Sequence, residues 1–244
     1  MIKYIQNSMP RKVGIIMKIS GLQKLTLLDF PGRLAATVFL GGCNFRCPFC
    51  HNASLVLAPA ECENIDEEEL FSFLASRKGK LTGVCVTGGE PTLYPTLKDF
   101  IKRIKEMGLA VKLDTNGTNP ELLSELIGQG LVDYVAMDIK NAPEKYSLTA
   151  GCEVDIEKVK KSVSLLLSEK VDYEFRTTVV KELHGEEDFL RISEWISGAK
   201  RYFLQTFKDS GDLIGSGFSA YSEAETEALL KVILTNVPNA QIRS

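Results

Sequence analysis

From residue 34 to residue 52 the chain reads Leu34-Ala-Ala-Thr-Val-Phe-Leu-Gly-Gly-Cys43-Asn-Phe-Arg-Cys47-Pro-Phe-Cys50-His-Asn52. The first nine residues are almost continuously apolar and end in two glycines, which predicts a short strand buried on both faces. Three cysteines, here called the cysteine triad, follow at once with the spacing Cys-x3-Cys-x2-Cys. Thiolates bind soft metals, and an iron–sulfur cube held by only three of them leaves one iron free for another ligand. The stretch therefore predicts a reactive metal centre at the end of a strand.

Predicted strands and helices alternate downstream of this stretch. Further strands are expected at residues 83–89, 110–114, 132–140, 173–180 and 201–207. Helices are expected after Asp66 and at about residues 97–107, 120–128, 156–169, 186–197 and 223–234. Six strand–helix units in strict alternation predict an α/β fold with a parallel sheet and outer helices. Six units are too few for the closed eight-stranded barrel, so we expect a partial (β/α)6 barrel, preceded by an irregular segment with a turn at residues 29–32.

Composition and charge exclude several classes of protein. The chain has 44% apolar and 25% charged residues, like an ordinary soluble globular protein, and its net charge of −3 does not favour nucleic acid as a partner. No apolar run reaches the roughly 20 residues that cross a bilayer. We therefore expect a cytoplasmic protein that binds neither nucleic acid nor membrane. No repeat or linker interrupts residues 18–244, which predicts a single domain, with residues 1–17 as an N-terminal extension or an upstream start before Met17.

The remaining cysteines leave a second interpretation of the triad open. Cys62, Cys85 and Cys152 are scattered, which does not resemble the disulfide framework of a small secreted domain, and Cys85 is expected in the core. The triad with either His51 or Cys62 could instead form a closed tetrahedral zinc site. His51 directly follows Cys50, so both side chains reach one ion only with difficulty.

Polar motifs end the next three predicted strands. These motifs are Thr87-Gly-Gly-Glu-Pro91, Asp114-Thr-Asn-Gly117 and Asp138-Ile-Lys140. The carboxyl ends of parallel strands lie along one face of the sheet, so these motifs are expected beside the triad. The two glycines let backbone approach a ligand closely, and Glu90 adds a carboxylate. Gly-Gly-Glu alone can be a simple tight turn, but a zinc site would have no use for it beside the triad.

With both motifs present, the chain resembles the radical S-adenosylmethionine (SAM) superfamily. The resemblance implies that Cys43, Cys47 and Cys50 hold a [4Fe-4S] cluster whose fourth iron is chelated by SAM. It also implies that Gly88, Gly89 and Glu90 hold the amino group of SAM and that Phe49 lies against its adenine. A cationic amino group suits carboxylate and carbonyl acceptors of this kind.

Within that superfamily, the chain is similar to the activating enzymes of glycyl-radical enzymes, including the pyruvate formate-lyase activating enzyme. The similarity is carried by His51 and Asn52 after the third cysteine, which become candidate cofactor-binding residues, and by the motifs that begin at Asp114 and Asp138. Residues 25–32, 111–118 and 135–140 look most like the longer activating proteins of anaerobic ribonucleoside-triphosphate reductases.

This resemblance implies roles for the polar strand ends. Asp114, Asn116 and Asp138 would approach SAM, and the two aspartates would also bind a monovalent cation, since carboxylates suit a hard cation. Lys140 would neutralise the carboxylate of SAM or bind its ribose, although it could also be a surface lysine. Arg176 matches an arginine near SAM.

Two positions depart from the pattern or fall outside it. Phe207 stands where the pyruvate formate-lyase activating enzyme places a histidine against the nucleoside, so that contact must differ, through Gln205 or through packing of Phe207. His184 is expected at the surface.

The resemblance implies a complete reaction. An electron from a flavodoxin or ferredoxin would reach the cluster, SAM would be cleaved to a 5′-deoxyadenosyl radical, and this radical would take a hydrogen atom from a glycine of the partner enzyme. No protein general base is required, so no catalytic residue is assigned. Two alternatives stay open: a radical SAM enzyme that acts on a small molecule or a peptide, and a zinc or iron–sulfur binding module without catalysis.

Overall fold

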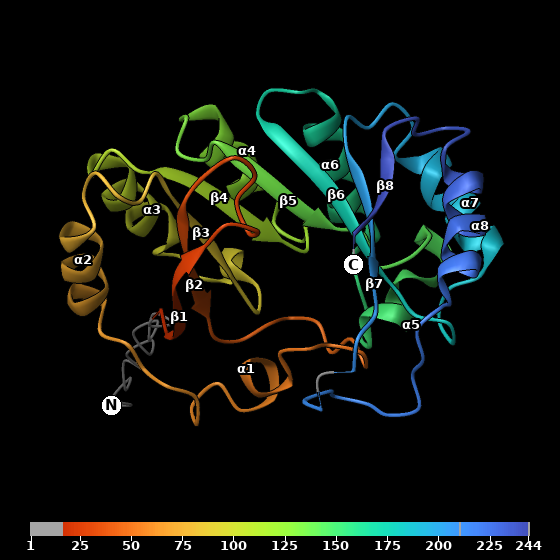
Figure 1. Cartoon of the computed structure of the whole chain (residues 1–244), viewed down its shortest axis with the longest axis horizontal. Helices are drawn as coiled ribbons and strands as arrows, with labels where there is room; N and C mark the ends of the chain where they lie inside the picture. The colour runs from red at the N-terminus through yellow and green to blue at the C-terminus, as the bar shows by residue number, and fades with distance from the viewer. Residues whose placement is uncertain (1–16, 210, 244) are drawn as a thin grey trace, which may run out of the picture.

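The strands form one eight-stranded sheet in sequential order, from β1 to β8 (Figure 1). The structure, a computed structural model, describes residues 17–209 and 211–243, so the expected N-terminal extension lies almost wholly outside the described residues. Strand β1 is antiparallel to β2, and all later neighbours are parallel. The strands are β1 (Ile19–Thr26), β2 (Ala35–Leu40), β3 (Gly83–Gly88), β4 (Ala110–Thr115), β5 (Tyr134–Asp138), β6 (Asp172–Val179), β7 (Tyr202–Thr206) and β8 (Ala240–Arg243).

Helices connect the parallel strands and pack outside the sheet, with α2 at the left and α7 and α8 at the right of Figure 1. The long helices are α2 (Glu67–Ser76), α3 (Leu97–Glu106), α4 (Pro120–Gly128), α6 (Ile156–Leu167), α7 (Glu186–Trp195) and α8 (Glu223–Ile233). Two short helices, α1 (Ala53–Leu57) and α5 (Tyr146–Ala150), and two 3-10 turns, Pro91–Leu93 and Pro143–Lys145, complete the connections. Among the described helices, none is long and apolar enough to cross a membrane.

The expected α/β architecture is confirmed, and the sheet gains a strand at each edge. The six expected strands and six expected helices lie within a few residues of their predicted bounds. The expectation of an irregular segment before β2 is wrong, because residues 19–26 form β1. Its sequence does not alternate, since irregular register with β2 after Ile19 and after Gln23 breaks the period of two. Strand β8 has only four residues, too few to show a period.

The two faces of the sheet differ in polarity because successive side chains along a strand point to opposite faces. Val84, Val86, Val111 and Leu113 are fully buried and belong to the main hydrophobic cluster, together with residues of the helices. The intervening positions on the same strands carry polar or ionisable side chains, namely Cys85, Thr87, Lys112 and Asp114. The inner, concave face of the barrel is therefore polar.

One sheet contains strands from both ends of the described chain, and buried residues of the helices and strands form one main hydrophobic cluster. We propose on this ground that residues 18–244 form a single domain. At either edge, β1 and β8 each pair with one neighbour in the sheet order, so the barrel is open between them.

Candidate active site

The cysteine triad lies in the loop that leaves β2, at the carboxyl ends of the strands. Gly42 begins this loop with a φ of +81°, a conformation that favours glycine, and Cys47 is buried while Cys43 and Cys50 are partly exposed. Burial raises the pKa of Cys43 to about 12 and that of Cys47 to about 11. The free thiols of Cys43 and Cys47 are therefore protonated at neutral pH, and they become thiolates when a metal displaces the protons.

The arrangement of the triad argues against a single zinc ion. Among residues 17–209 and 211–243, no three Cys, His, Asp or Glu side chains lie close enough together to hold one metal ion. The two candidates for a fourth zinc ligand are turned elsewhere. The His51 ring stacks on Phe207, with centroids 5.5 Å apart and planes at 21°, and Cys62 Sγ lies 3.7 Å from the Ala58 carbonyl oxygen. In a [4Fe-4S] cube each cysteine binds its own iron, so three thiols suffice without converging on one ion.

The Gly-Gly-Glu loop packs backbone against backbone on the start of the cysteine loop. The amide of Gly89 donates to the Leu40 carbonyl at 2.8 Å, and the amide of Glu90 donates to the Gly42 carbonyl at 2.9 Å. A Cβ at Gly89 would lie 1.9 Å from the Gly42 oxygen, and Gly88 has a φ of +124°. Only glycine fits at these two positions, and the close contact sets the spacing between this loop and the triad.

The Glu90 carboxylate points into the protein and accepts four hydrogen bonds. Oε1 accepts from the Thr92 amide (3.0 Å) and hydroxyl (2.5 Å) and from the Thr115 hydroxyl (2.8 Å). Oε2 accepts from the Asn116 amide at 2.6 Å, and the Asn116 side chain donates to Asn44 in the cysteine loop at 2.8 Å. Sequence reasoning placed Glu90 at the amino group of SAM. In this structure its carboxylate joins the ends of β3 and β4, and it is linked to the cysteine loop through Asn116.

Substituting Glu90→Gln separates these two roles. A glutamine cannot accept at both positions, so one buried amide hydrogen bond is lost, and we expect the free energy of unfolding to fall by about 2 kcal/mol. Denaturation by urea measures this, with Glu125→Gln, an exposed carboxylate paired with Lys98, as a control expected to cost under about 0.5 kcal/mol. A large loss of SAM affinity at unchanged stability would instead place the carboxylate at the amino group.

A chain of alternating charges crosses the ends of β4, β5 and β6 on the inner face. Arg176 lies between two carboxylates, with Nη1 3.2 Å from Asp114 Oδ2 and Nε 2.9 Å from Asp138 Oδ1. Lys112 pairs with Asp114, and Lys140 Nζ lies 3.0 Å from Asp138 Oδ2. Burial alone would raise the pKa of Asp138, but Arg176 and Lys140 outweigh it and hold the pKa at about 2. Both aspartates are therefore charged and already neutralised by protein cations, which a monovalent cation would have to displace.

These elements enclose one cavity of about 470 Å³. Every candidate residue named from the sequence lines it except Glu90, which lies behind the wall. Sequence reasoning missed Asp29 and Thr178, which also line the cavity, whereas Gln205 was named as a possible replacement for the histidine and lines it too. Asp29 was taken as part of a turn, and its neighbouring residues gave no signal that it turns inward. Phe207 stacks on His51, so at this strand end Gln205 is the side chain that faces the cavity.

His184 is buried, so its predicted surface position is wrong. The amide of Val180 donates to Nδ1 at 3.1 Å, which leaves the proton on Nε2 to bond with the Lys140 carbonyl at 2.8 Å. Burial lowers the pKa of His184, so the ring is neutral. It packs edge-on against Phe49, with centroids 6.4 Å apart. His184 thus supports two cavity residues from behind, which a lone histidine in a loop could not reveal.

An open α/β barrel with three thiols and a backbone glycine loop at its strand ends defines a class of cluster-dependent enzymes. The sequence pattern of the radical SAM superfamily matches residues 37–196, and the chain belongs to this family. Membership implies a [4Fe-4S] cluster and SAM as cofactors, and three cysteine thiols that line one cavity are ligands of the kind that such a cluster takes.

Two relatives and one solved structure place the chain within the superfamily. It is 34% identical over 236 residues to a protein of Methanocaldococcus jannaschii provisionally named as a glycyl-radical enzyme activating enzyme, covering 93% of this chain and 95% of that one. It is 31% identical over 135 residues to the pyruvate formate-lyase-activating enzyme of Clostridium pasteurianum, covering 53% and 55%. A domain of the pyruvate-formate lyase-activating enzyme from Bacteroides vulgatus shares the fold, with a TM-score of 0.56, 19% identity and coverage of 66% and 99%.

Proposed function

We propose that this protein is an activating enzyme that forms a glycyl radical on a partner enzyme, and that the partner is an anaerobic ribonucleoside-triphosphate reductase. The observation that carries the proposal is the meeting of the triad, the glycine loop and the charged strand ends at one cavity. The near full-length similarity to the Methanocaldococcus jannaschii protein supports the activating role. The identity of the partner rests on the sequence resemblance alone.

The cavity residues suit the parts of SAM and its cluster. Cys43, Cys47 and Cys50 would hold the cluster, and the backbone carbonyls of Gly88 and Gly89 would accept from the amino group. When bound, the two cofactors together supply a carbon-centred radical that removes a hydrogen atom from the substrate. Lys140 and Arg176 would bind the carboxylate and ribose, each already oriented by Asp138.

The aromatic side of the cavity, formed by Phe49 and His51, would bind the adenine and help to exclude water. Phe49 lines the cavity while most of its surface is buried, and the neutral His184 ring fixes it from behind. His51 and Asn52 line the same side, with the Asn52 side chain 3.4 Å from the Gly88 carbonyl. A preset apolar wall of this kind limits access of water to a reactive intermediate.

Three finer predictions concern the electron donor, a cation and the location of the protein. A flavodoxin or ferredoxin as electron donor, a monovalent cation at Asp114 and Asp138, and a cytoplasmic location rest on the sequence alone. Because Arg176 pairs with both aspartates, a cation that binds there would have to displace it.

The test is anaerobic reconstitution with iron and sulfide, followed by reduction with dithionite in the presence of SAM. We expect four irons per chain and release of 5′-deoxyadenosine, and we expect a glycyl doublet in electron spin resonance after the reductase is added. Failure to form 5′-deoxyadenosine would contradict the enzyme and favour a binding module. Formation of 5′-deoxyadenosine with no glycyl radical on any glycyl-radical protein would favour a small molecule or a peptide as substrate.

A further inference from the structure

Three exposed leucines gather at the end of β1. Leu25, Leu27 and Leu28 are 56%, 72% and 89% exposed, and they lie within four residues of sequence. The other exposed large apolar side chains of the described chain are dispersed along the sequence: Leu57, Leu93, Leu148, Leu190 and Leu234. Single exposed leucines are common on protein surfaces, whereas an apolar cluster marks an interaction site. We call these three residues the leucine patch.

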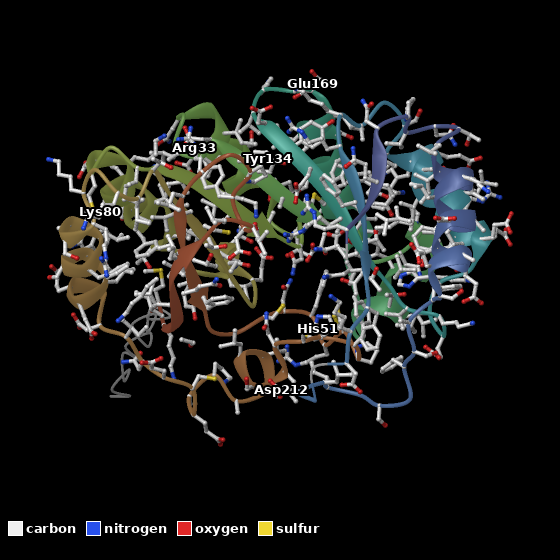
Figure 2. The ribbon with its side chains drawn as sticks, in the orientation of Figure 1. Arg33, His51, Lys80, Tyr134, Glu169 and Asp212 are labelled. Carbon is white, nitrogen blue, oxygen red and sulfur yellow. The ribbon has the colours of Figure 1, made fainter. Side chains whose placement is uncertain are left out.

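The loop that carries the leucine patch is anchored on both sides. The Thr26 hydroxyl accepts from the amides of Leu28 and Asp29, each at 3.2 Å, which fixes the turn after β1. Phe30 is buried, and its ring lies 6.1 Å from that of Tyr134 on β5. Figure 2 shows Tyr134 near Arg33, which follows this loop, at the end of the sheet away from His51. The leucines are thus held toward solvent by a fixed backbone.

The same loop forms part of the cavity wall. Asp29 lines the cavity, and its carboxylate accepts from the Thr37 hydroxyl on β2. Neighbouring Cα atoms are about 3.8 Å apart, so the patch begins one residue from the wall. In Figure 1 the loop after β1 reaches toward the middle of the concave side, where the sheet is open between β1 and β8. Leu28 directly precedes Asp29, so a partner that contacts this part of the cavity wall from outside also meets the leucine patch.

We propose that the leucine patch is the docking surface for the protein whose glycine segment enters the cavity, an inference that rests on the proposed function. A small substrate would fit within the cavity and leave the leucines in water, so the patch favours a macromolecule. Lys24 and Arg33 flank the patch, are exposed and form no ion pair within residues 17–209 and 211–243. The complementary partner surface is therefore apolar and bordered by carboxylates.

The test compares Leu27→Gln/Leu28→Gln with Leu148→Gln, an exposed leucine on α5. Dithionite serves as reductant, so the measured rates do not depend on the docking of a protein electron donor. The probe is the glycyl-radical protein that the wild type activates, and the yield of glycyl radical is followed against its concentration. We expect the KM for this protein to rise about tenfold or more with kcat unchanged at saturation. Formation of 5′-deoxyadenosine without the partner should equal that of the wild type, and Leu148→Gln should change neither value.

An unchanged KM in the double variant would overturn the docking surface while leaving the proposed function intact. A wild type that elutes as a dimer in size-exclusion chromatography, and a double variant that elutes as a monomer, would assign the patch to a second copy and also overturn it. If the wild type makes 5′-deoxyadenosine but activates no glycyl-radical protein, the proposed function is wrong. The proposal that such a protein docks on the leucine patch is then wrong as well. Both leucines are mostly exposed, so circular dichroism should confirm that the double variant is folded.

Discussion

Substituting Cys47→Ala should reduce both the iron content and the formation of 5′-deoxyadenosine to background. Each cysteine of the triad holds a different iron of the proposed cluster, so the loss of one thiolate leaves only two attachment points. Cys47 is buried, and without a metal its thiol is protonated, because burial raises its pKa to about 11. Cys47→Ser keeps the size of the side chain and should fail in the same way. Iron analysis, the visible absorbance of the reconstituted protein and chromatography of the products measure these effects.

Cys62→Ala is the matched control for this substitution. Cys62 is partly exposed, and its nearest hydrogen-bond partner is the Ala58 carbonyl, so its loss should leave iron content and product formation unchanged. Loss of metal on substitution of Cys62 would instead support the zinc site that the sequence left open. Retention of the full iron content by Cys47→Ala would contradict the assignment of the triad.

Most of the site could be predicted because its residues come directly after strands. The apolar strand ending in Gly42, and the motifs at Gly88, Asp114 and Asp138, place their side chains at one end of a parallel sheet whatever the packing around them. The helices could be predicted because apolar residues recur at the helical period, and a segment with this pattern buries one face against the sheet.

The features that were missed depend on contacts between distant segments. Neither the internal hydrogen bonds of Glu90 nor the burial of His184 follows from the neighbouring residues. Asp29 lines the cavity because β1 pairs with β2 and because Phe30 anchors the loop between them. Neither contact could be predicted, since the irregular register of β1 leaves no alternating pattern in its sequence. Propensity and period describe local structure, so they do not predict which of two polar side chains in a loop turns inward.

Substituting Arg176→Met should lower the free energy of unfolding by about 3 kcal/mol at pH 7. Arg176 pairs with Asp114 at 3.2 Å and with Asp138 at 2.9 Å; the Arg176 and Asp114 side chains are largely buried, and that of Asp138 is 31% exposed. Methionine fills a similar volume but leaves each carboxylate with a single lysine. Arg191→Met is the matched control, because Arg191 forms one exposed pair with Glu194, and we expect it to cost less than about 0.5 kcal/mol.

The pH dependence of this deficit distinguishes lost charge from lost packing. In the wild type the pKa of Asp138 is about 2, below the value of about 3.9 for an unfolded aspartate, so its ionised form adds stability above pH 4 that disappears as the pH falls through 2. Without Arg176 the pKa values of Asp138 and Asp114 should rise, because burial raises both values and one of the positive charges that lower them is gone. The difference in unfolding free energy between wild type and Arg176→Met should therefore be full at pH 7 and shrink as the pH falls below 4. Urea denaturation under nitrogen at both ends of this range measures it, and an equal deficit at both would assign the loss to packing.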